Sequence, residues 1–203
     1  MKDAVNFKVS VFNQLDTDIL DLTDIDVSEI TTFYGNESDI YTDKELFYNL
    51  DISKARYIDI TGWNTSNAYS FMCLFAGCSN IEKIYGIEDL DVTNIWNLSH
   101  MFENCKKLES LDFSKWKPKY SIQYIWHMFD GCESLKSIKG LNNFKLYRMS
   151  CPSTECTFRN CYKLNNLDIS SWDFNIIDNI TDMFAGCYSL CNLKIQLTLQ
   201  ELK

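Results

Sequence analysis

The segment Met101-Phe102-Glu103-Asn104-Cys105 contains the pattern that decides the fold of this 203-residue chain. A phenylalanine followed three positions later by a cysteine recurs along the chain in the same context. The five phenylalanines are 27, 27, 29 and 26 residues apart, and they are Phe75, Phe102, Phe129, Phe158 and Phe184. A fixed period of this length predicts a solenoid, in which each unit buries its apolar edge by stacking on its neighbours.

Each unit continues in a way that predicts a strand and a turn or helix in every coil. Apolar residues follow the cysteine at the third and sixth positions, as Leu108 and Leu111 follow Cys105. The second of them begins a short tail that alternates faces like a strand. This tail has two forms, Leu-Asp-x-Ser-x-Trp in residues 111–116 and a glycine form in residues 84–87. The Met/Phe pair and the apolar residues after it fit a short helical turn with one buried face.

These features predict an α/β, leucine-rich-repeat-like, right-handed solenoid of about five coils over residues 58–195. Short strands are expected on one side, and short helices or turns on the other. Register also places Trp63, Trp116 and Trp172 at inner or turn positions. The residues after the first strand position should form a charge ladder on the strand face, and they are Tyr85, Asp112, Lys139, Asp168 and Lys194.

The two ends of the chain are expected to differ from the coils. Residues 1–57 do not keep the register, and terminal repeats need a more polar cover, so an acidic N-terminal cap is predicted there. Within it, the residues of a predicted strand alternate, and they are Val5, Phe7, Val9 and Val11. Residues 42–45 form a capping box that should open a short helix. Residues 196–203 are a short C-terminal end.

The repeated unit resembles the BspA-type leucine-rich repeats of bacterial and protist surface proteins. The resemblance rests on Leu-Asp-x-Ser-x-Trp, a short spacer, and Met-Phe-x-Gly-Cys-x-x-Leu-x-x-Leu, and it covers residues 58–195. It implies a curved repeat array used for adhesion or protein binding, with no catalytic residues to carry over.

The cysteines are predicted to be reduced thiols, most of them buried. Nine occur in the chain, and cysteine suits an inner column because it is small, apolar and usually buried. The column is Cys78, Cys105, Cys132, Cys161 and Cys187. The N-terminus lacks the apolar core of a secretory signal peptide, and no stretch approaches the about 20 apolar residues of a membrane span. A cytoplasmic protein without a membrane span is expected, the alternative being a cell-surface protein whose signal peptide was removed.

The charge of the chain is concentrated at its N-terminal end. The net charge is −9, and residues 1–60 carry thirteen acids and five bases, a net charge of −8. Residues 106–148 hold nine bases and four acids, a net charge of +5. This distribution argues against direct nucleic-acid binding through a general positive field. The acidic end instead suits a partner with a basic surface, the alternative being a solvated, charged cap.

Catalytic chemistry has little support in the sequence, so neither an enzyme nor a cofactor is expected. The chain has two histidines, and it contains no glycine-rich phosphate loop and no hydrolase motif. The residues two positions before each register phenylalanine are plausible zinc ligands, and they are Cys73, His100, His127, Cys156 and Asp182. A variable polar column without a metal is expected there. The helix sides of such solenoids spread apart, and four ligands at about 2.0–2.3 Å from one ion cannot span several coils.

Binding specificity is expected from residues outside the repeat register. Four aromatic residues of repeats one to three and three acids near the N-terminus are the candidates, and they are Tyr69, Trp96, Tyr124, Trp126, Asp21, Asp24 and Asp26. Exposed aromatic residues on neighbouring coils have the composition of a binding hot spot. The alternative is that they pack on one another or against the N-terminal cap.

These observations favour a noncatalytic module that binds a protein partner across its curved face or its aromatic ridge. Two alternatives stay open. One is an intracellular inhibitor, of phage or mobile-element type, whose acidic end blocks a basic nucleic-acid-binding groove on its target. The other is a surface adhesin fragment that lacks its export signal.

Overall fold

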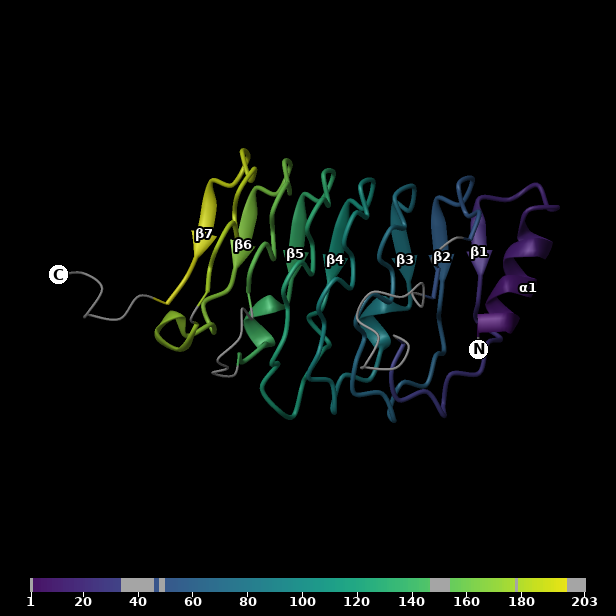
Figure 1. The fold of residues 1–203 in the computed structure, drawn as a ribbon, viewed down its shortest axis with the longest axis horizontal. Helices are drawn as coiled ribbons and strands as arrows, with labels where there is room; N and C mark the ends of the chain where they lie inside the picture. Colours follow the sequence, from purple (N-terminus) through teal and green to yellow (C-terminus); the bar gives the residue numbers. More distant parts are fainter. Residues whose placement is uncertain (1, 34–45, 48–49, 147–153, 178, 197–203) are drawn as a thin grey trace.

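The structure is a computed structural model, and it describes residues 2–33, 46–47, 50–146, 154–177 and 179–196. It is a stack of coils, each of which contributes one short strand to the same side of the molecule (Figure 1). The strands are β1 (Ile19–Asp21), β2 (Tyr57–Asp59), β3 (Lys83–Tyr85), β4 (Ser110–Asp112), β5 (Ser137–Lys139), β6 (Asn166–Asp168) and β7 (Asn192–Lys194). They are parallel and form two sheets, of order β1-β2-β3 and β4-β5-β6-β7. The predicted repeat solenoid is confirmed.

Each strand from β1 to β6 places its middle side chain in the core. Leu20, Ile58 and Ile84 are buried, and they pair in register across β1, β2 and β3. Their neighbours on either side face outward, as the two-residue repeat of a strand requires. One strand therefore contributes one apolar side chain per coil to a continuous core.

The outward residues form the predicted charge ladder. Asp112 on β4 lies 3.9 Å from Lys139 on β5, and Asp168 on β6 lies 3.6 Å from Lys194 on β7. These side chains are partly or fully exposed, so each pair contributes only about 0.2–1 kcal/mol. The ladder confirms the predicted strand phase and leaves the strand face with opposite charges next to one another.

The side opposite the strands is built from turns, which were one of the two structures expected there. Phe75 donates its backbone N–H to the carbonyl oxygen of Met101 on the next coil, and Phe102 donates to Met128, both at 2.9 Å. An α-helix would direct these amides to the carbonyl four residues earlier, so bonding between coils replaces the helix. Left-handed backbone at residues such as His100, with a φ of 58°, accompanies this arrangement.

The register phenylalanines stack through the centre of the molecule. The rings of Phe102 and Phe129 lie 5.8 Å apart with an interplanar angle of 3°, and those of Phe129 and Phe158 lie 5.4 Å apart at 10°. Beside them runs the predicted column of cysteines. Its first four members are buried and Cys187 is half-buried. The eight cysteines that the structure describes form no disulfide with one another.

The two forms of the strand tail have different structures. In the tryptophan form, Trp116 is fully buried and donates from Nε1 to the carbonyl oxygen of Ile87 on the preceding coil at 2.9 Å. Trp172 repeats this bond to Leu141 at 3.2 Å. In the glycine form, a left-handed glycine precedes a short 3₁₀ turn, which is η1 (Ile87–Asp89) or η2 (Leu141–Asn143). A further 3₁₀ turn, η3 (Phe174–Ile176), follows the last tryptophan tail.

The N-terminal end corrects one expectation and extends the stack. The predicted strand in residues 5–11 is wrong, because this segment lies in the helix α1 (Lys2–Phe12). Val5, Val9 and Phe12 are buried at helical spacing, whereas the Phe7 side chain is 67% exposed. After α1, β1 pairs with β2 and so continues the stack into the segment expected to form a cap. The predicted capping box at residues 42–45 lies outside the described residues.

The C-terminal coil covers its core less completely. Met183 is buried there, but Ile180 is 57% exposed and Tyr188 is 86% exposed. All three residues of β7 are exposed. None of the described helices is both long enough and apolar enough to pass through a membrane.

Candidate functional site

The four aromatic residues outside the register form one continuous row, which we call the aromatic ladder (Tyr69, Trp96, Tyr124 and Trp126). The rings of Tyr69 and Trp96 stack 6.1 Å apart with an interplanar angle of 5°. Trp96 meets Tyr124 edge to face at 5.6 Å, and Tyr124 lies 6.5 Å from Trp126. The solenoid thus brings together side chains that are up to 57 residues apart in sequence.

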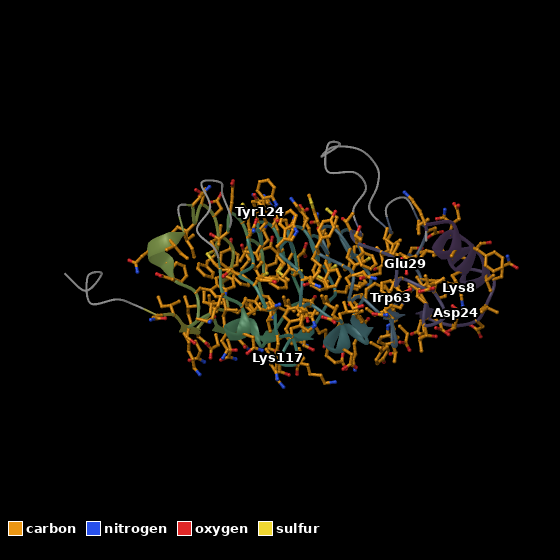
Figure 2. The ribbon with its side chains drawn as sticks, turned by 90° about the horizontal axis from the view of Figure 1, so that it is seen from below. Lys8, Asp24, Glu29, Trp63, Lys117 and Tyr124 are labelled. Carbon is orange, nitrogen blue, oxygen red and sulfur yellow. The ribbon has the colours of Figure 1, made fainter. Side chains whose placement is uncertain are left out.

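Backbone pairing between coils fixes the positions of these side chains. Ser70, Asn97 and Tyr124 form parallel bridges from one coil to the next. Trp96 donates its N–H to the carbonyl oxygen of Tyr69 at 3.0 Å. The ladder therefore stands on a second row of parallel pairing, away from the main sheets. Figure 2 shows Tyr124 on the opposite side of the molecule from Lys117.

The sequence left open whether these rings are exposed or pack on one another, and the structure combines the two. All four side chains are half-buried, because each covers its neighbours while one part of it stays accessible. Stacking of this kind reduces the number of rotamers that a binding partner would have to immobilise. The ladder is consequently a preorganised, partly apolar surface.

The column of possible zinc ligands, where no metal was expected, separates into buried and accessible members. Cys73 and Cys156 are buried, whereas His100 and His127 are half-buried. All five members of the column have left-handed backbone. The rings of His100 and His127 stack 5.0 Å apart with an interplanar angle of 8°, so this side of the solenoid does not spread as expected. Coil-to-coil hydrogen bonds of the turn segments keep the spacing close to that of paired strands.

Each histidine is paired with a carboxylate three residues later. Nδ1 of His100 lies 2.7 Å from Oε2 of Glu103, and Nδ1 of His127 lies 2.9 Å from Oδ2 of Asp130. Asp130 also accepts hydrogen bonds from the guanidinium group of Arg159. Burial raises the pKa of Asp130, but the bonds from His127 and Arg159 outweigh that effect and hold its pKa below the usual value.

The three acids of the candidate site are exposed, and they differ in their partners. Asp21 and Asp26 accept hydrogen bonds from Thr23 and Ser28, which lower the pKa of both carboxyl groups. Asp24 lies 2.6 Å from Lys8 on α1, and Figure 2 shows the two side chains together at that end. The charge of Asp24 is therefore compensated by direct contact with Lys8, whereas Lys8 has only a smaller effect on the pKa of Asp21.

The acidic segment joins the ladder at its first ring. Asn67 donates from Nδ2 to the carbonyl oxygen of Ser28 at 2.8 Å, and Tyr69 donates its N–H to Thr31 at 2.8 Å. Residues 28–31 consequently lie beside residues 67–69. Asp26 stands two positions before Ser28, close to the Tyr69 end of the ladder.

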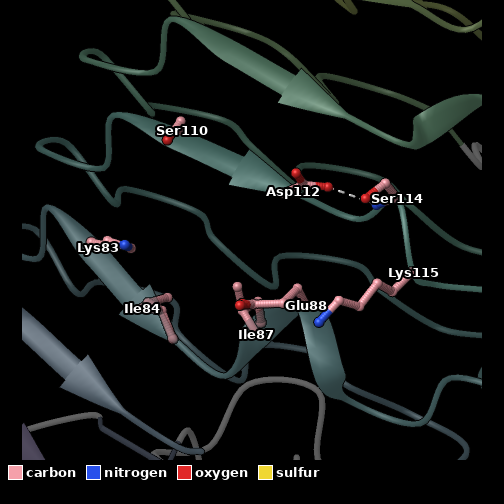
Figure 3. A pocket seen from close by; sticks show the side chains of 8 residues that line it. All are labelled: Lys83, Ile84, Ile87, Glu88, Ser110, Asp112, Ser114 and Lys115. Atoms are coloured by element: carbon pink, nitrogen blue, oxygen red, sulfur yellow. Dashed lines mark hydrogen bonds between the residues drawn. The ribbon is translucent and has the colours of Figure 1, made fainter.

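A groove of about 350 Å³ on the strand side was not predicted (Figure 3). It lies where the first sheet ends at β3 and the second begins at β4. The glycine form of the tail borders it, but the same form follows β5, where the sheet continues to β6, so the sequence gives no separate signal for the groove. Charged residues of both signs line the groove, among them Lys83, Glu88, Asp112 and Lys115. Neighbouring opposite charges compensate one another, so the groove favours no single class of ion.

The comparisons with known proteins place the repeat array in a family. No curated protein matches the chain. A family model described as "Mycoplasma protein of unknown function, DUF285" matches residues 41–157 and 152–198. This match agrees with the BspA-type resemblance at the level of a tandem-repeat family. Because it covers more than half of the residues, the chain belongs to the family described as Mycoplasma protein of unknown function, DUF285.

Proposed function

We propose that this solenoid is a noncatalytic binding module that holds a partner protein along the aromatic ladder. The observation that carries the proposal is the continuous row of contacting, half-buried rings from Tyr69 to Trp126. Large aromatic side chains supply most of the energy at many protein interfaces, particularly where they are already ordered. The strand face offers a partner fewer unpaired charges, since its aspartates and lysines already pair with one another between neighbouring strands.

The noncatalytic part of the proposal is supported by the state of the cysteines and histidines. Burial raises the pKa of the Cys105, Cys132 and Cys161 thiols, which keeps them in the protonated, unreactive form. Both histidines are engaged with carboxylates three residues away. The buried thiols therefore act in packing.

The position of the acids suggests the chemistry of the partner. Asp21 and Asp26 keep their charge to lower pH than an ordinary aspartate, and Asp26 lies near the Tyr69 end of the ladder. A partner that presents an apolar stripe flanked by basic residues would match both features. The acids would attract it, and the rings would retain it.

The test compares capture of partner proteins from the native host by three immobilised chains. These are the unmodified chain, Trp96→Ala, and the control Tyr188→Ala, which removes an exposed aromatic ring outside the ladder. We expect a protein that the unmodified chain and Tyr188→Ala retain and that Trp96→Ala loses. Thermal unfolding of each variant shows whether the fold is intact. If a folded Trp96→Ala retains every captured protein as strongly as the control does, the ladder is not the binding surface.

A further inference from the structure

We propose that His100, Glu103 and His127 form a binding site for a divalent transition-metal ion of the zinc type. One potential ligand atom from each of these three residues lies within 4.8 Å of the other two. All three side chains are half-buried, so an ion from solution can reach them. Two imidazoles and a carboxylate are a donor set that suits zinc and its neighbours in the first transition series.

The backbone of two adjacent coils brings these residues together. His100 donates its N–H to the carbonyl oxygen of Trp126, at 3.0 Å, and so aligns its coil with the coil that carries His127. Both histidines have left-handed backbone, with φ of 58° and 53°, and their rings stack 5.0 Å apart. The spacing is set before any ion arrives, because it comes from the repeat and not from the side chains.

The third ligand comes from the same coil as the first. Glu103 follows His100 by three residues, and its Oε2 atom already lies 2.7 Å from the Nδ1 atom of His100. Two adjacent coils therefore supply three ligands, and Cys73 and Cys156, on the coils to either side of this pair, are not needed. The objection that one ion cannot span several coils does not apply to this set.

Binding of zinc requires a small rearrangement of the three ligand side chains. Ligand atoms around a tetrahedral zinc ion are about 3.4 Å apart, given zinc–nitrogen distances of about 2.0–2.1 Å. The three ligand atoms lie up to 4.8 Å apart, so the two rings and the carboxylate must move closer together by rotation of their side chains. Three protein ligands leave a fourth position for water or for a group from a partner.

A neighbouring ion pair supports the orientation of one ligand. Asp130 lies 2.9 Å from Nδ1 of His127, and Arg159 holds Asp130 in turn. Carboxylates that hydrogen-bond to a ligating histidine commonly fix the orientation of its ring. We assign Asp130 this positioning role, with Glu103 as the ligand.

The experiment titrates zinc chloride into the full chain after removal of metal with a chelator. His100 and His127 are the only histidines in the chain, so the ring signals in NMR spectra belong to this site alone. We expect both ring signals to shift together and to stop shifting at one equivalent of zinc. Cysteine-bound zinc would leave both signals in place, which distinguishes the proposed site from adventitious uptake by the nine thiols.

Variants supply the second readout. The double variant His100→Asn, His127→Asn should lose one equivalent of bound zinc in equilibrium dialysis, and asparagine tolerates left-handed backbone. Glu103→Gln should weaken zinc binding by about tenfold or more. Asp182→Asn is the matched control, since it changes the same left-handed position on the last coil and should leave zinc binding unchanged.

Three results would overturn the proposal. They are ring signals that do not respond to zinc, a response from only one ring, and zinc uptake that persists undiminished in the folded double variant. None of these results bears on the aromatic ladder, because partner capture by the Trp96→Ala variant is measured separately and in the presence of chelator.

Discussion

The thiol of Cys132 donates a hydrogen bond to the carbonyl oxygen of Phe102 on the preceding coil, with 3.1 Å between sulfur and oxygen. Cys105, Cys161 and Cys187 make the same bond to the phenylalanine 29 to 32 residues earlier, at 3.0–3.2 Å. Cysteine at this position is therefore a small apolar residue and also a donor to a backbone oxygen that faces the core.

Replacing Cys132 tests both properties. Cys132→Ala removes the donor and leaves Phe102 with a buried, less satisfied carbonyl group, so we expect a loss of about 1–3 kcal/mol in the free energy of unfolding. Cys132→Asp should unfold the array, because it places an unpaired charge at a fully buried position. Urea unfolding followed by circular dichroism measures the first effect and the loss of signal shows the second. A folded Cys132→Asp variant of near-normal stability would contradict this account of the column.

The glycine form of the tail gives a second prediction about stability. Gly140 has a φ of 83°, and a Cβ atom added there would lie 2.3 Å from the backbone carbonyl carbon of Phe113. Gly140→Ala should therefore combine strained backbone with a clash against the preceding coil, and we expect a loss of more than about 3 kcal/mol.

Gly62→Ala is the matched control. Gly62 has a similar φ of 88°, but nothing lies within 4 Å of the added atom. Only backbone strain remains, at about 1–2 kcal/mol. Chemical denaturation of the two variants side by side separates strain from close approach. Equal losses would mean that the contact between Gly140 and Phe113 does not restrict the residue at this position.

Much of the fold could be predicted because the repeat constrains many residues in the same way. The strand phase followed from the alternation around Leu111 and Leu167, and their burial confirms it. The row of turns was harder to separate from a helix. Both structures bury a residue every three or four positions, and the choice depends on hydrogen bonds to the next coil, such as that from Phe102 to Met128.

The N-terminal helix shows why one pattern can support two structures. Val5 and Val9 fit both the two-residue repeat of a strand and the four-residue spacing of a helix. Phe12 distinguishes the two in favour of the helix, since it continues the buried stripe of Val5 and Val9 while Phe7 is exposed. The continuation of the stack into β1 did have a signal. Leu20-Asp21-Leu22-Thr23 has the same pattern as residues 58–61, and Asp21 and Asp59 make the same hydrogen bond to the amide two residues later.

The candidate surface was predicted in composition but not in arrangement. The aromatic residues could be identified because they do not occupy register positions. Their contacts involve a one-residue offset, because Tyr124 lies in the column of Ser70 and Asn97, one position after the column of Tyr69 and Trp96. The closeness of His100 and His127 depends on the turn side keeping strand-like spacing, which sequence periodicity does not specify.

The ion pair at Asp130 predicts sensitivity to acid. Hydrogen bonds from His127 and Arg159 hold the pKa of Asp130 below its ordinary value of 3.8, against the effect of burial. Its stabilising contribution is complete above that value and is lost as the pH falls through the lower pKa of the folded state. We expect Asp130→Asn to reduce the free energy of unfolding by about 2 kcal/mol at pH 7, because it removes a charge that Arg159 bonds directly.

The difference between the unmodified chain and Asp130→Asn should then shrink as the pH is lowered below 3.8. Urea unfolding midpoints at a series of pH values from neutral to acid measure this. The control is Asp89→Asn, which changes a carboxylate in an exposed ion pair with Lys115, where an effect of at most about 1 kcal/mol is expected. A difference that grows with acid would show that the sign of the Asp130 contribution is wrong.

The last prediction separates the role of the acids from that of the rings. Asp21 and Asp26 are exposed and have no basic partner in an ion pair among the described residues, whereas Asp24 is paired with Lys8 at 2.6 Å. Long-range attraction of a basic partner acts on the rate of association, and exposed charges contribute less as salt increases. For the protein captured through the ladder, the double variant Asp21→Asn, Asp26→Asn should slow association at low salt and leave dissociation unchanged. Asp24→Asn should slow it less, because it removes one negative charge and the double variant removes two. Trp96→Ala should instead speed dissociation, since the ring acts only after contact.

Association and dissociation rates measured at several salt concentrations test all three variants together. Association that is equally fast in the double variant and the unmodified chain at low salt would remove the acids from the mechanism and leave the ladder as the whole interface.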